Sequence, residues 1–178
     1  MFLIDILLVT LTVLLLIFTC SMVANIWLKV PYVPTEDRVV KVMVDHANLQ
    51  YGNVVYDLGA GDGRVLIAAL NRIPSIYATA VEAVFTVYFW GRIKTRLSKK
   101  KITWKCGSLF KQDVSDADVI FLYLFPSLMK KLEKKFDEEL KSGTRIVSHA
   151  FQFPNRKPIK VIEVPCKKRV RKVYVYEW

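Results

Sequence analysis

The chain has 178 residues, which is enough for one domain around one hydrophobic core. Hydrophobic residues make up 53% and charged residues 24%, a balance that excludes intrinsic disorder. The formal net charge is +11. The three cysteines lie far apart without CxxC spacing, which argues against a disulfide scaffold and a zinc ribbon, and we expect no metal.

Residues 6–24 form an uncharged run of mostly aliphatic side chains, followed by Trp27 and Lys29. A helix needs about 20 such residues to cross a bilayer, and an aromatic residue at its end is typical of an interfacial anchor. A cleaved signal peptide and a buried core helix are the alternatives, but a signal peptide has a basic start and a shorter apolar run. We therefore expect residues 1–28 to be a transmembrane anchor and residues 29–178 to form the functional domain.

The charges around this run predict its orientation. Asp5 is the only charged residue among the first 28, and all 27 lysines and arginines follow. Because basic residues favour the cytoplasmic side, we expect a single-pass membrane protein with its domain in the cytoplasm.

Residues 31–35 (Pro-Tyr-Val-Pro-Thr) are predicted to be extended, since each proline disfavours helix in the residue before it. Thr35 is predicted to cap a helix that continues to about Leu49. The rest of the chain alternates, with strands predicted at 53–58, 76–81, 101–106, 118–125 and 144–150, and helices at 64–71, 85–99 and 127–140.

The last predicted helix has an inner face of four residues: Leu128, Leu132, Phe136 and Leu140. After it, strands 157–164 and 170–178 have no helix between them, so we expect an antiparallel hairpin. The whole pattern predicts an α/β, Rossmann-like fold, in which a mostly parallel sheet carries helices on both faces and the hairpin closes one edge. Ligands bind such sheets beyond the carboxyl ends of the strands, where strand order reverses.

The first strand runs into a glycine-rich turn, Asp-Leu-Gly-Ala-Gly-Asp-Gly-Arg over residues 57–64. A tight turn alone would explain one glycine, whereas Gly59, Gly61 and Gly63 at alternate positions favour close approach of a ligand. A dinucleotide motif would place its third glycine at Arg64, and a P-loop would need a following Gly-Lys-Ser/Thr. Neither is present.

The turn also carries two acidic side chains, Asp57 and Asp62. They would repel a pyrophosphate but suit a positively charged ligand such as S-adenosyl-L-methionine, with its sulfonium and ammonium groups. Glu82, at the end of the second strand, could accept both ribose hydroxyls, although a solvated strand-end residue is the alternative. Ser108 and Leu109, after the third strand, would lie by the adenine, although Gly-Ser is also ordinary loop chemistry.

Taken in order, five segments resemble class I S-adenosylmethionine-dependent methyltransferases: residues 31–34, 57–64, Glu82, 124–127 and 143–149. More narrowly, the chain is similar to the group that contains the lysine methyltransferases of the adenine nucleotide translocase and of the c-subunit of ATP synthase, and above all to their prokaryotic relatives. The resemblance covers about residues 29–165 and a preceding membrane helix.

The resemblance implies roles for several residues. The glycine turn (Asp57, Gly59, Ala60, Gly61 and Gly63) would hold the methionine part of the cofactor, and Glu82 its ribose. Residues 31–35, including Pro31, Tyr32 and Thr35, would fold over the cofactor as a lid. The chain departs from the family at Ser108, where relatives carry an Asp, and at residues 155–158, where relatives have a Trp before the Lys or Gln.

Methyl transfer requires a nucleophile held in line with the sulfonium methyl in a dry slot. Tyr123, Phe125 and Pro126 lie at the end of the fourth strand and His149 ends the fifth; these are the candidate catalytic residues. Tyr123 could orient an amine and His149 could accept a proton, while core packing is the alternative for Phe125 and a structural role for His149. No Asn-Pro-Pro-Tyr or Asp-Pro-Pro-Tyr motif is present, which favours an aliphatic amine as acceptor.

Basic residues gather in two clusters, at residues 92–101 and at residues 156–172. Contact with anionic lipid, a solvated surface and nucleic acid binding are all compatible with them. The leading hypothesis is a membrane-anchored methyltransferase that acts on a lysine of a membrane-associated protein. The alternatives are an RNA methyltransferase that uses the basic hairpin and a catalytically silent cofactor-binding module.

Overall fold

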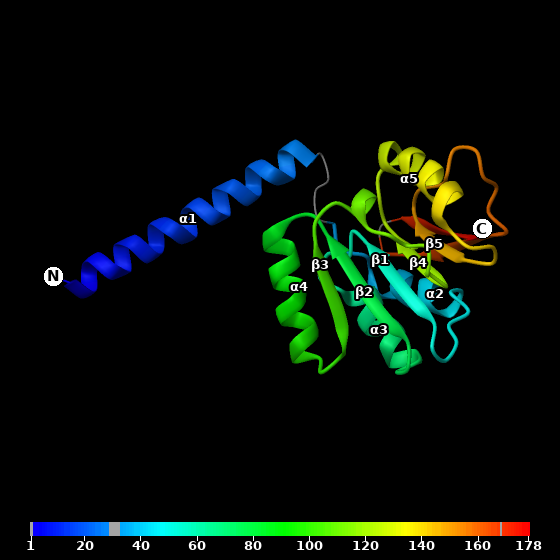
Figure 1. Cartoon of the computed structure of the whole chain (residues 1–178), viewed down its shortest axis with the longest axis horizontal. Coiled ribbons are helices and arrows are strands. Elements are labelled where there is room, and N and C mark those ends of the chain that lie inside the picture. The colour runs from blue at the N-terminus through cyan, green and yellow to red at the C-terminus, as the bar shows by residue number, and fades with distance from the viewer. Residues whose placement is uncertain (1, 29–32, 168) are drawn as a thin grey trace.

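The computed structural model describes residues 2–28, 33–167 and 169–178, with the backbone alone over 21–28. A long helix, α1 (Phe2–Leu28), extends away from an α/β domain (Figure 1). Within the described residues the domain contains the strands β1 (Val54–Leu58), β2 (Tyr77–Glu82), β3 (Ile102–Cys106), β4 (Val119–Leu122), β5 (Arg145–His149), β6 (Lys160–Pro165) and β7 (Val170–Glu177). Its helices are α2 (Asp37–Asp45), α3 (Arg64–Arg72), α4 (Phe85–Leu97), α5 (Pro126–Glu139) and the short 3-10 helix η1 (Leu109–Lys111).

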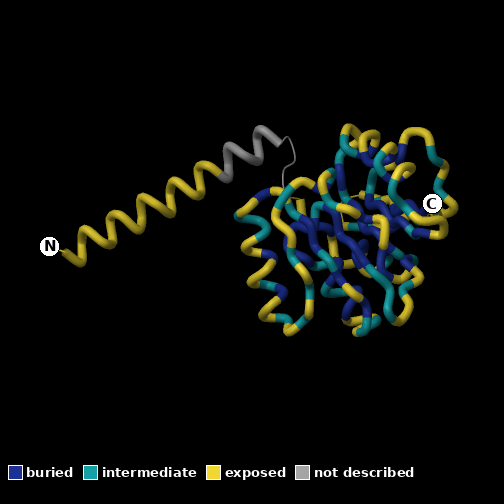
Figure 2. The backbone as a smooth tube through the Cα atoms, viewed as in Figure 1, coloured by how far each residue is buried: buried dark blue, intermediate teal, exposed yellow. Residues whose placement is uncertain are grey.

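Helix α1 keeps its described side chains away from the domain core. Residues 2–20 are all exposed, and the segment Phe2–Cys20 has a mean hydropathy of 2.7 (Figure 2). The hydroxyls of Thr10 and Thr12 donate to the carbonyls of Ile6 and Leu8, which satisfies them within the helix. By length and composition the helix could cross a membrane, and a signal sequence would meet the same criterion. The side chain of Trp27, predicted as an anchor, lies outside the described set.

The seven strands form one sheet in the order β3-β2-β1-β4-β5-β7-β6. The first five run parallel, and β7 pairs antiparallel with both β5 and β6. The expected parallel sheet and closing hairpin are therefore confirmed. Strand order reverses between β1 and β4, where Asp57 pairs with Ala80 on one side and with Phe121 on the other.

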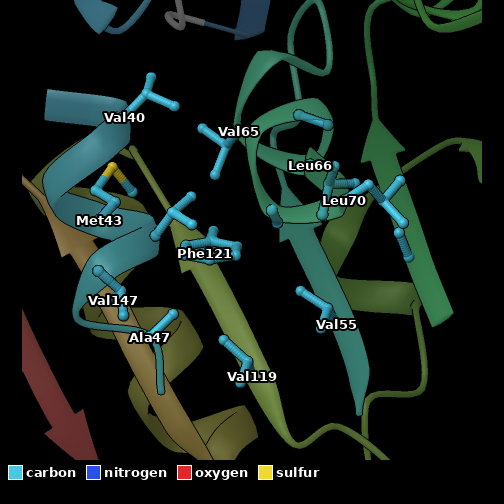
Figure 3. Close-up of a cluster of buried hydrophobic side chains, with 14 of the residues drawn as sticks. Val40, Met43, Ala47, Val55, Val65, Leu66, Leu70, Val119, Phe121 and Val147 are labelled. Carbon is cyan, nitrogen blue, oxygen red and sulfur yellow. The ribbon is translucent and has the colours of Figure 1, made fainter. Parts of the chain in front are cut away.

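Alternate side chains of the strands belong to two core clusters on opposite faces of the sheet. On one face Val55, Val119 and Val147 pack against α2 and α3 (Figure 3). On the other face Tyr56, Ile120 and Ile146 pack against α5, together with the buried helix residues Met129, Leu132 and Phe136. Helices therefore cover both faces, as predicted.

The first helix of the domain differs from its prediction at both ends. Glu36, not Thr35, occupies the N-cap position, and its side chain makes no capping hydrogen bond. The helix ends at Asp45 instead of about Leu49, because residues 46–48 form a turn in which Asn48 has a φ of 52°. Thr35 is buried instead.

Strand β4 and helix α5 also depart from expectation. Strand β4 ends at Leu122, since its last partners are Leu58 and Ser148, and β1 turns away after Leu58. In α5 the buried face consists of Met129, Leu132, Glu133 and Phe136, while the expected Leu128 and Leu140 are only partly buried. A series spaced every four residues drifts by about 40° per step around a helix, so its ends leave the inner face.

Candidate functional site

A cavity of about 610 Å³ opens at the carboxyl edge of the parallel strands. Asp57 reaches it from β1 and Glu82 from β2, while Gly107, Tyr123 and Phe151 reach it from the loops after β3, β4 and β5. The cavity therefore lies at the reversal of strand order, where the sequence predicts a ligand site. Its volume is in the range of sites for small ligands.

The glycine turn needs its glycines for two different reasons. Gly59 and Gly61 lie on the cavity wall with Ala60 and have φ of 85° and 57°. A Cβ atom on Gly59 would approach the Cδ2 atom of Leu124 to 2.9 Å. Gly63 lies off the cavity wall, and a Cβ atom there would come within 2.8 Å of the side chain of Thr95 on α4. Packing of α4, and not only ligand approach, therefore explains Gly63.

Asp57 places a buried carboxyl group on the cavity wall. Only 5% of the residue is exposed, and no hydrogen-bond donor of the described chain reaches the carboxyl oxygens. Burial, followed by the neighbouring charges of Glu82 and Asp62, raises the pKa of Asp57 from 3.8 to about 8. A ligand cation at this position would restore the ionised form.

Asp62, the second carboxylate of the turn, is already neutralised by two cations. It forms ion pairs with Arg64, at 2.9 Å, and with Lys94 of α4. Burial tends to raise the pKa of Asp62, but the hydrogen bonds from Arg64 and Lys94 outweigh it and lower the pKa to about 2. The prediction that both carboxylates attract a positive ligand is thus wrong for Asp62, which holds α4 against the turn.

Glu82 links the glycine turn to the start of α4. One carboxylate oxygen accepts a hydrogen bond from the backbone N–H of Gly61 at 3.0 Å, and the other accepts one from the N–H of Val84 at 2.9 Å. The side chain is half-buried on the cavity wall. Each carboxylate oxygen keeps further acceptor capacity, so Glu82 can support the turn and still receive hydroxyl groups.

The loop after β3 and the expected lid both reach the cavity. Leu109 is buried on the wall, and Ser108 beside it accepts a hydrogen bond from the N–H of Phe110 through its Oγ, at 3.3 Å. Thr35 is on the wall, and its carbonyl accepts a bond of 2.7 Å from the Arg64 guanidinium. Pro31 and Tyr32, the other candidate lid residues, lie outside the described residues.

Aromatic side chains form the far wall of the cavity. The ring of Phe151 lies 6.3 Å from that of Tyr123 and 5.8 Å from that of Phe125, measured between ring centroids. All three rings line the cavity, and Leu128 joins them. Pro126 is the first residue of α5 and is not part of this wall.

His149 lies beneath the aromatic wall. Its ring stacks on Tyr123 with 4.0 Å between centroids, and the residue is 1% exposed and off the cavity surface. Neither ring nitrogen has a hydrogen-bond partner among the described residues. Burial, then the charges of Arg171 and Arg169, lower the pKa of His149 from 6.5 to about 4. The imidazole is therefore neutral at physiological pH and weakly basic.

The sequence analysis missed four residues that shape this site. Phe151, Arg169 and Arg171 line the cavity, and Gly91 of α4 packs against the glycine turn: a Cβ atom there would approach the carbonyl oxygen of Gly61 to 2.7 Å. A glycine inside a predicted helix was the available signal for Gly91. The two arginines come from the hairpin, whose place beside β5 brings its turn to the carboxyl edge.

The family model of the ANTKMT methyltransferase domain matches residues 57–160. The chain belongs to this methyltransferase family. A protein-lysine N-methyltransferase of Saccharolobus islandicus (strain REY15A) is 36% identical over 154 residues, which cover 83% of this chain and 92% of that protein. The lysine N-methyltransferase of the ATP synthase c-subunit from Homo sapiens is 26% identical over 72% of this chain, and the match spans 54% of the human protein.

Solved structures of methyltransferases share the fold. An RNA methyltransferase from Salinibacter ruber, in complex with S-adenosyl-L-homocysteine, has a TM-score of 0.74 and 32% identity over 82% of this chain and 93% of that one. A precorrin-6y C5,15-methyltransferase from Geobacter metallireducens has a TM-score of 0.67 at 19% identity, over 83% of this chain and 91% of that one. This ANTKMT-family protein is thus an S-adenosylmethionine-dependent methyltransferase with the expected Rossmann-like fold.

Proposed function

We propose that this ANTKMT-family protein is a protein-lysine N-methyltransferase that uses the cavity at the carboxyl edge of its sheet for both the cofactor and the acceptor amine. The observation that carries the proposal is the buried carboxyl group of Asp57, which no donor of the described residues reaches, in a cavity that aromatic rings also line. The 36% identity to the Saccharolobus lysine methyltransferase supports the acceptor class.

The residues on the cavity wall fit S-adenosylmethionine. The carboxyl group of Asp57 would receive the α-ammonium, and the backbone of Gly59–Gly61 would let the methionine part approach closely. Glu82 would accept the ribose hydroxyls while it still holds Gly61 and Val84. Leu109 and Ser108 would border the adenine. The cofactor supplies a methyl group on a sulfonium, which is a good leaving group.

The aromatic wall would receive the acceptor lysine. The rings of Tyr123, Phe125 and Phe151 keep water from the slot, and a dry slot lowers the pKa of an amine, so they favour deprotonation of the lysine. Tyr123 offers a hydroxyl that could orient the amine. His149 would act as a positioning residue, because its ring stacks on Tyr123 and does not reach the cavity.

RNA is the second candidate acceptor. The Salinibacter relative is named an RNA methyltransferase, and Arg169 and Arg171 place positive charge on the cavity wall, where phosphates would bind. Three of the seven described bases at residues 156–172 are paired with carboxylates within the protein, however. Arg171 lies 3.9 Å from Glu36, Lys172 pairs with Glu163, and Arg156 pairs with Asp137 and stacks on Trp178. This pairing favours a protein acceptor.

We further propose that α1 spans the membrane as an anchor, with the domain on the cytoplasmic side. The apolar and exposed side chains of its residues 2–20 support this, as do the names of relatives that act on the c-subunit of ATP synthase or on the adenine nucleotide translocase. The basic clusters would contact anionic lipid, and the acceptor would be a membrane-associated protein.

The test is methyl transfer onto native membranes. The full-length protein and its Asp57→Ala variant are incubated with membranes and methyl-labelled cofactor, and the product is treated with protease or with nuclease. We expect the parent to transfer label and the variant to transfer none. We expect protease to release this label and nuclease to leave it in place. Label that resists protease and is released by nuclease would overturn the lysine assignment in favour of RNA.

A further inference from the structure

Helix α4 carries its large apolar side chains on its outer surface. Phe85, Phe89, Ile93 and Leu97 recur at every fourth residue, which places neighbouring members of the series side by side along a stripe that turns slowly around the helix, and Trp90 adjoins them. Their exposed fractions range from 38% for Ile93 to 78% for Leu97. The outer side of α4 is accordingly exposed along its length (Figure 2). We call these five residues the α4 apolar face.

The folded domain does not need this face for its own packing. On the inner side of α4, Gly91 and Thr95 are buried, and Trp104 of β3 packs on them and donates a hydrogen bond to the Thr95 hydroxyl at 3.0 Å. The helix therefore docks through small residues and directs its large ones outwards. That is the reverse of the usual pattern for a helix on a sheet, and it marks an interaction surface.

Basic residues border the α4 apolar face. Arg92 and Arg96 are exposed on the helix, and Lys99, Lys100 and Lys101 follow its C-terminus. None of these five pairs with a carboxylate within the described chain, whereas three of the seven described bases at residues 156–172 do. An apolar face with exposed aromatic rings and a basic flank is the composition of a helix that lies in the headgroup region of an anionic bilayer.

The position of α4 fits the same partner. Helix α1 is in contact with α4, yet the apolar face stays exposed (Figures 1 and 2). At the start of α4, Val84 and Val87 line the cavity, whereas Phe85 is exposed to solvent. A surface that seats the α4 apolar face would therefore lie next to the cavity.

We propose that the α4 apolar face is a second membrane contact, which lies in the surface of an anionic phospholipid bilayer and holds the cavity at the level of the lipid headgroups. This rests on the proposed function for the anchor α1 and for the acceptor, which would carry its lysine at that level. Insertion of Trp90 and its neighbours, together with attraction of the flanking bases, would fix the orientation of the domain on the membrane that α1 anchors.

Lipid contact is measured directly by tryptophan quenching. The full-length protein is reconstituted in vesicles of phosphatidylcholine and phosphatidylglycerol, about two to one, with bromine on the acyl chains as quencher. We expect Trp90→Phe to remove a large part of the quenched emission, and Trp178→Phe, which alters a ring packed on Phe136, to leave it unchanged. Equal quenching in the parent and in Trp90→Phe would overturn the proposal. Because this readout needs no turnover, it stands apart from the proposed function.

The effect on catalysis is tested with matched surface variants. Phe85, Phe89 and Leu97 are replaced by Ser together; the control replaces Tyr51, which precedes β1, and Tyr77, the first residue of β2, two exposed rings outside the α4 apolar face. We expect the triple variant to lose about tenfold or more activity on a membrane-embedded acceptor and to keep its activity on a soluble lysine peptide, with the control unaffected. Equal losses on both substrates would contradict the proposal. So would a parent dimer in detergent that the triple variant abolishes, because the face would then join two copies.

Discussion

Asp57 combines two properties that oppose each other in the ligand-free protein. Its carboxyl group is buried with no hydrogen-bond donor among the described residues, which is unfavourable for the ionised form, and it lines the cavity where a cation would stabilise that form. Burial, with Glu82 and Asp62, raises its pKa from 3.8 to about 8. The residue therefore links stability, pH and cofactor binding, and two predictions follow from the sign of this shift.

The first prediction concerns the stability of the ligand-free protein. Between pH 3.8 and about 8 the folded state keeps a proton on Asp57 that the unfolded state has lost. The contribution of protonated Asp57 to the free energy of unfolding is therefore fully present below pH 3.8 and is lost as the pH rises through about 8. We expect Asp57→Asn to raise the free energy of unfolding at pH 8 by about 1–3 kcal/mol and to flatten this slope. Urea titrations at pH 6 and pH 8 measure it; a variant less stable than the parent at pH 8 would refute the assignment.

The second prediction concerns cofactor binding. An ammonium beside Asp57 lowers its pKa, so binding of S-adenosylmethionine at pH 7 should release a proton and should tighten from pH 6 to pH 8. Asp57→Asn should weaken binding by about 1.5–3 kcal/mol and abolish the proton release. Calorimetry in buffers of different ionisation enthalpy reports both quantities. Parent-like affinity in the variant would mean that the ammonium binds elsewhere.

A third prediction separates positioning from proton transfer at His149. Its pKa of about 4 leaves the imidazole neutral above pH 6, so it should add no titration to the pH profile there. We expect His149→Gln to lower kcat/KM by less than about tenfold and to preserve the shape of that profile from pH 6 to pH 9, whereas loss of a general base costs about 10²-fold or more. Steady-state rates on a lysine peptide distinguish the two roles. A loss of kcat/KM of about 10²-fold with a changed pH profile would make His149 the general base.

Apart from Thr35, the site residues that the sequence predicts on the cavity wall all adjoin strand ends along the chain. Asp57, Glu82 and Ser108 were found in this way, because parallel strands bring their carboxyl ends to one edge. Asp62 was misjudged, since its neutralisation by Lys94 depends on the docking of α4, 32 residues away. Arg171 was not predicted for a similar reason: no local sequence motif predicts that the hairpin pairs with β5.

At the scale of elements, α4 supports the site through its glycine. We expect Gly91→Ala to cost about 1–3 kcal/mol of stability, because the added Cβ atom would come within 2.3 Å of Trp104 and 2.7 Å of the Gly61 carbonyl, and to weaken cofactor binding through the displaced turn.

The matched control for Gly91→Ala is Gly52→Ala. Gly52 has open space around it but a φ of 79°, so the control should lose stability and keep its cofactor affinity. Thermal unfolding and cofactor titration of the two variants, side by side, test the distinction. Unchanged cofactor affinity in Gly91→Ala would show that α4 does not support the turn.

The elements themselves were largely predictable, and their ends were not. Alternation of apolar runs with amphipathic segments predicted every strand and α-helix of the domain, though not the short 3-10 helix η1, because one sheet covered on both faces demands that pattern. The ends depend on pairing and on tertiary contacts: β4 stops where β1 turns away, and α2 stops at the turn of residues 46–48. The exposure of the α4 apolar face was not predictable, because the periodicity of apolar residues does not show which side of a helix faces the sheet.

For the whole molecule, the separation of α1 from the domain core leads to a prediction about the anchor. None of the residues 2–20 is buried, so removal of residues 1–28 should leave a folded domain with parent-like cofactor affinity. Activity on a membrane acceptor should fall by about 10²–10⁴-fold, because confinement to one bilayer is lost, while activity on a lysine peptide should persist. The ratio of the two rates in both proteins is the measurement. Equal falls on both substrates would show that α1 does not guide the choice of acceptor.

The central claim, that the cavity passes a methyl group from S-adenosylmethionine to a lysine amine, is tested most directly by locating the transferred group. Membranes labelled by the full-length protein with a deuterated-methyl cofactor are digested and analysed by tandem mass spectrometry, beside a sample labelled by Asp57→Ala. We predict deuterated methyl groups on lysine Nε atoms of a membrane-associated protein, and none with the variant. Label found on nucleosides, or on lysines to the same extent with Asp57→Ala, would contradict the claim.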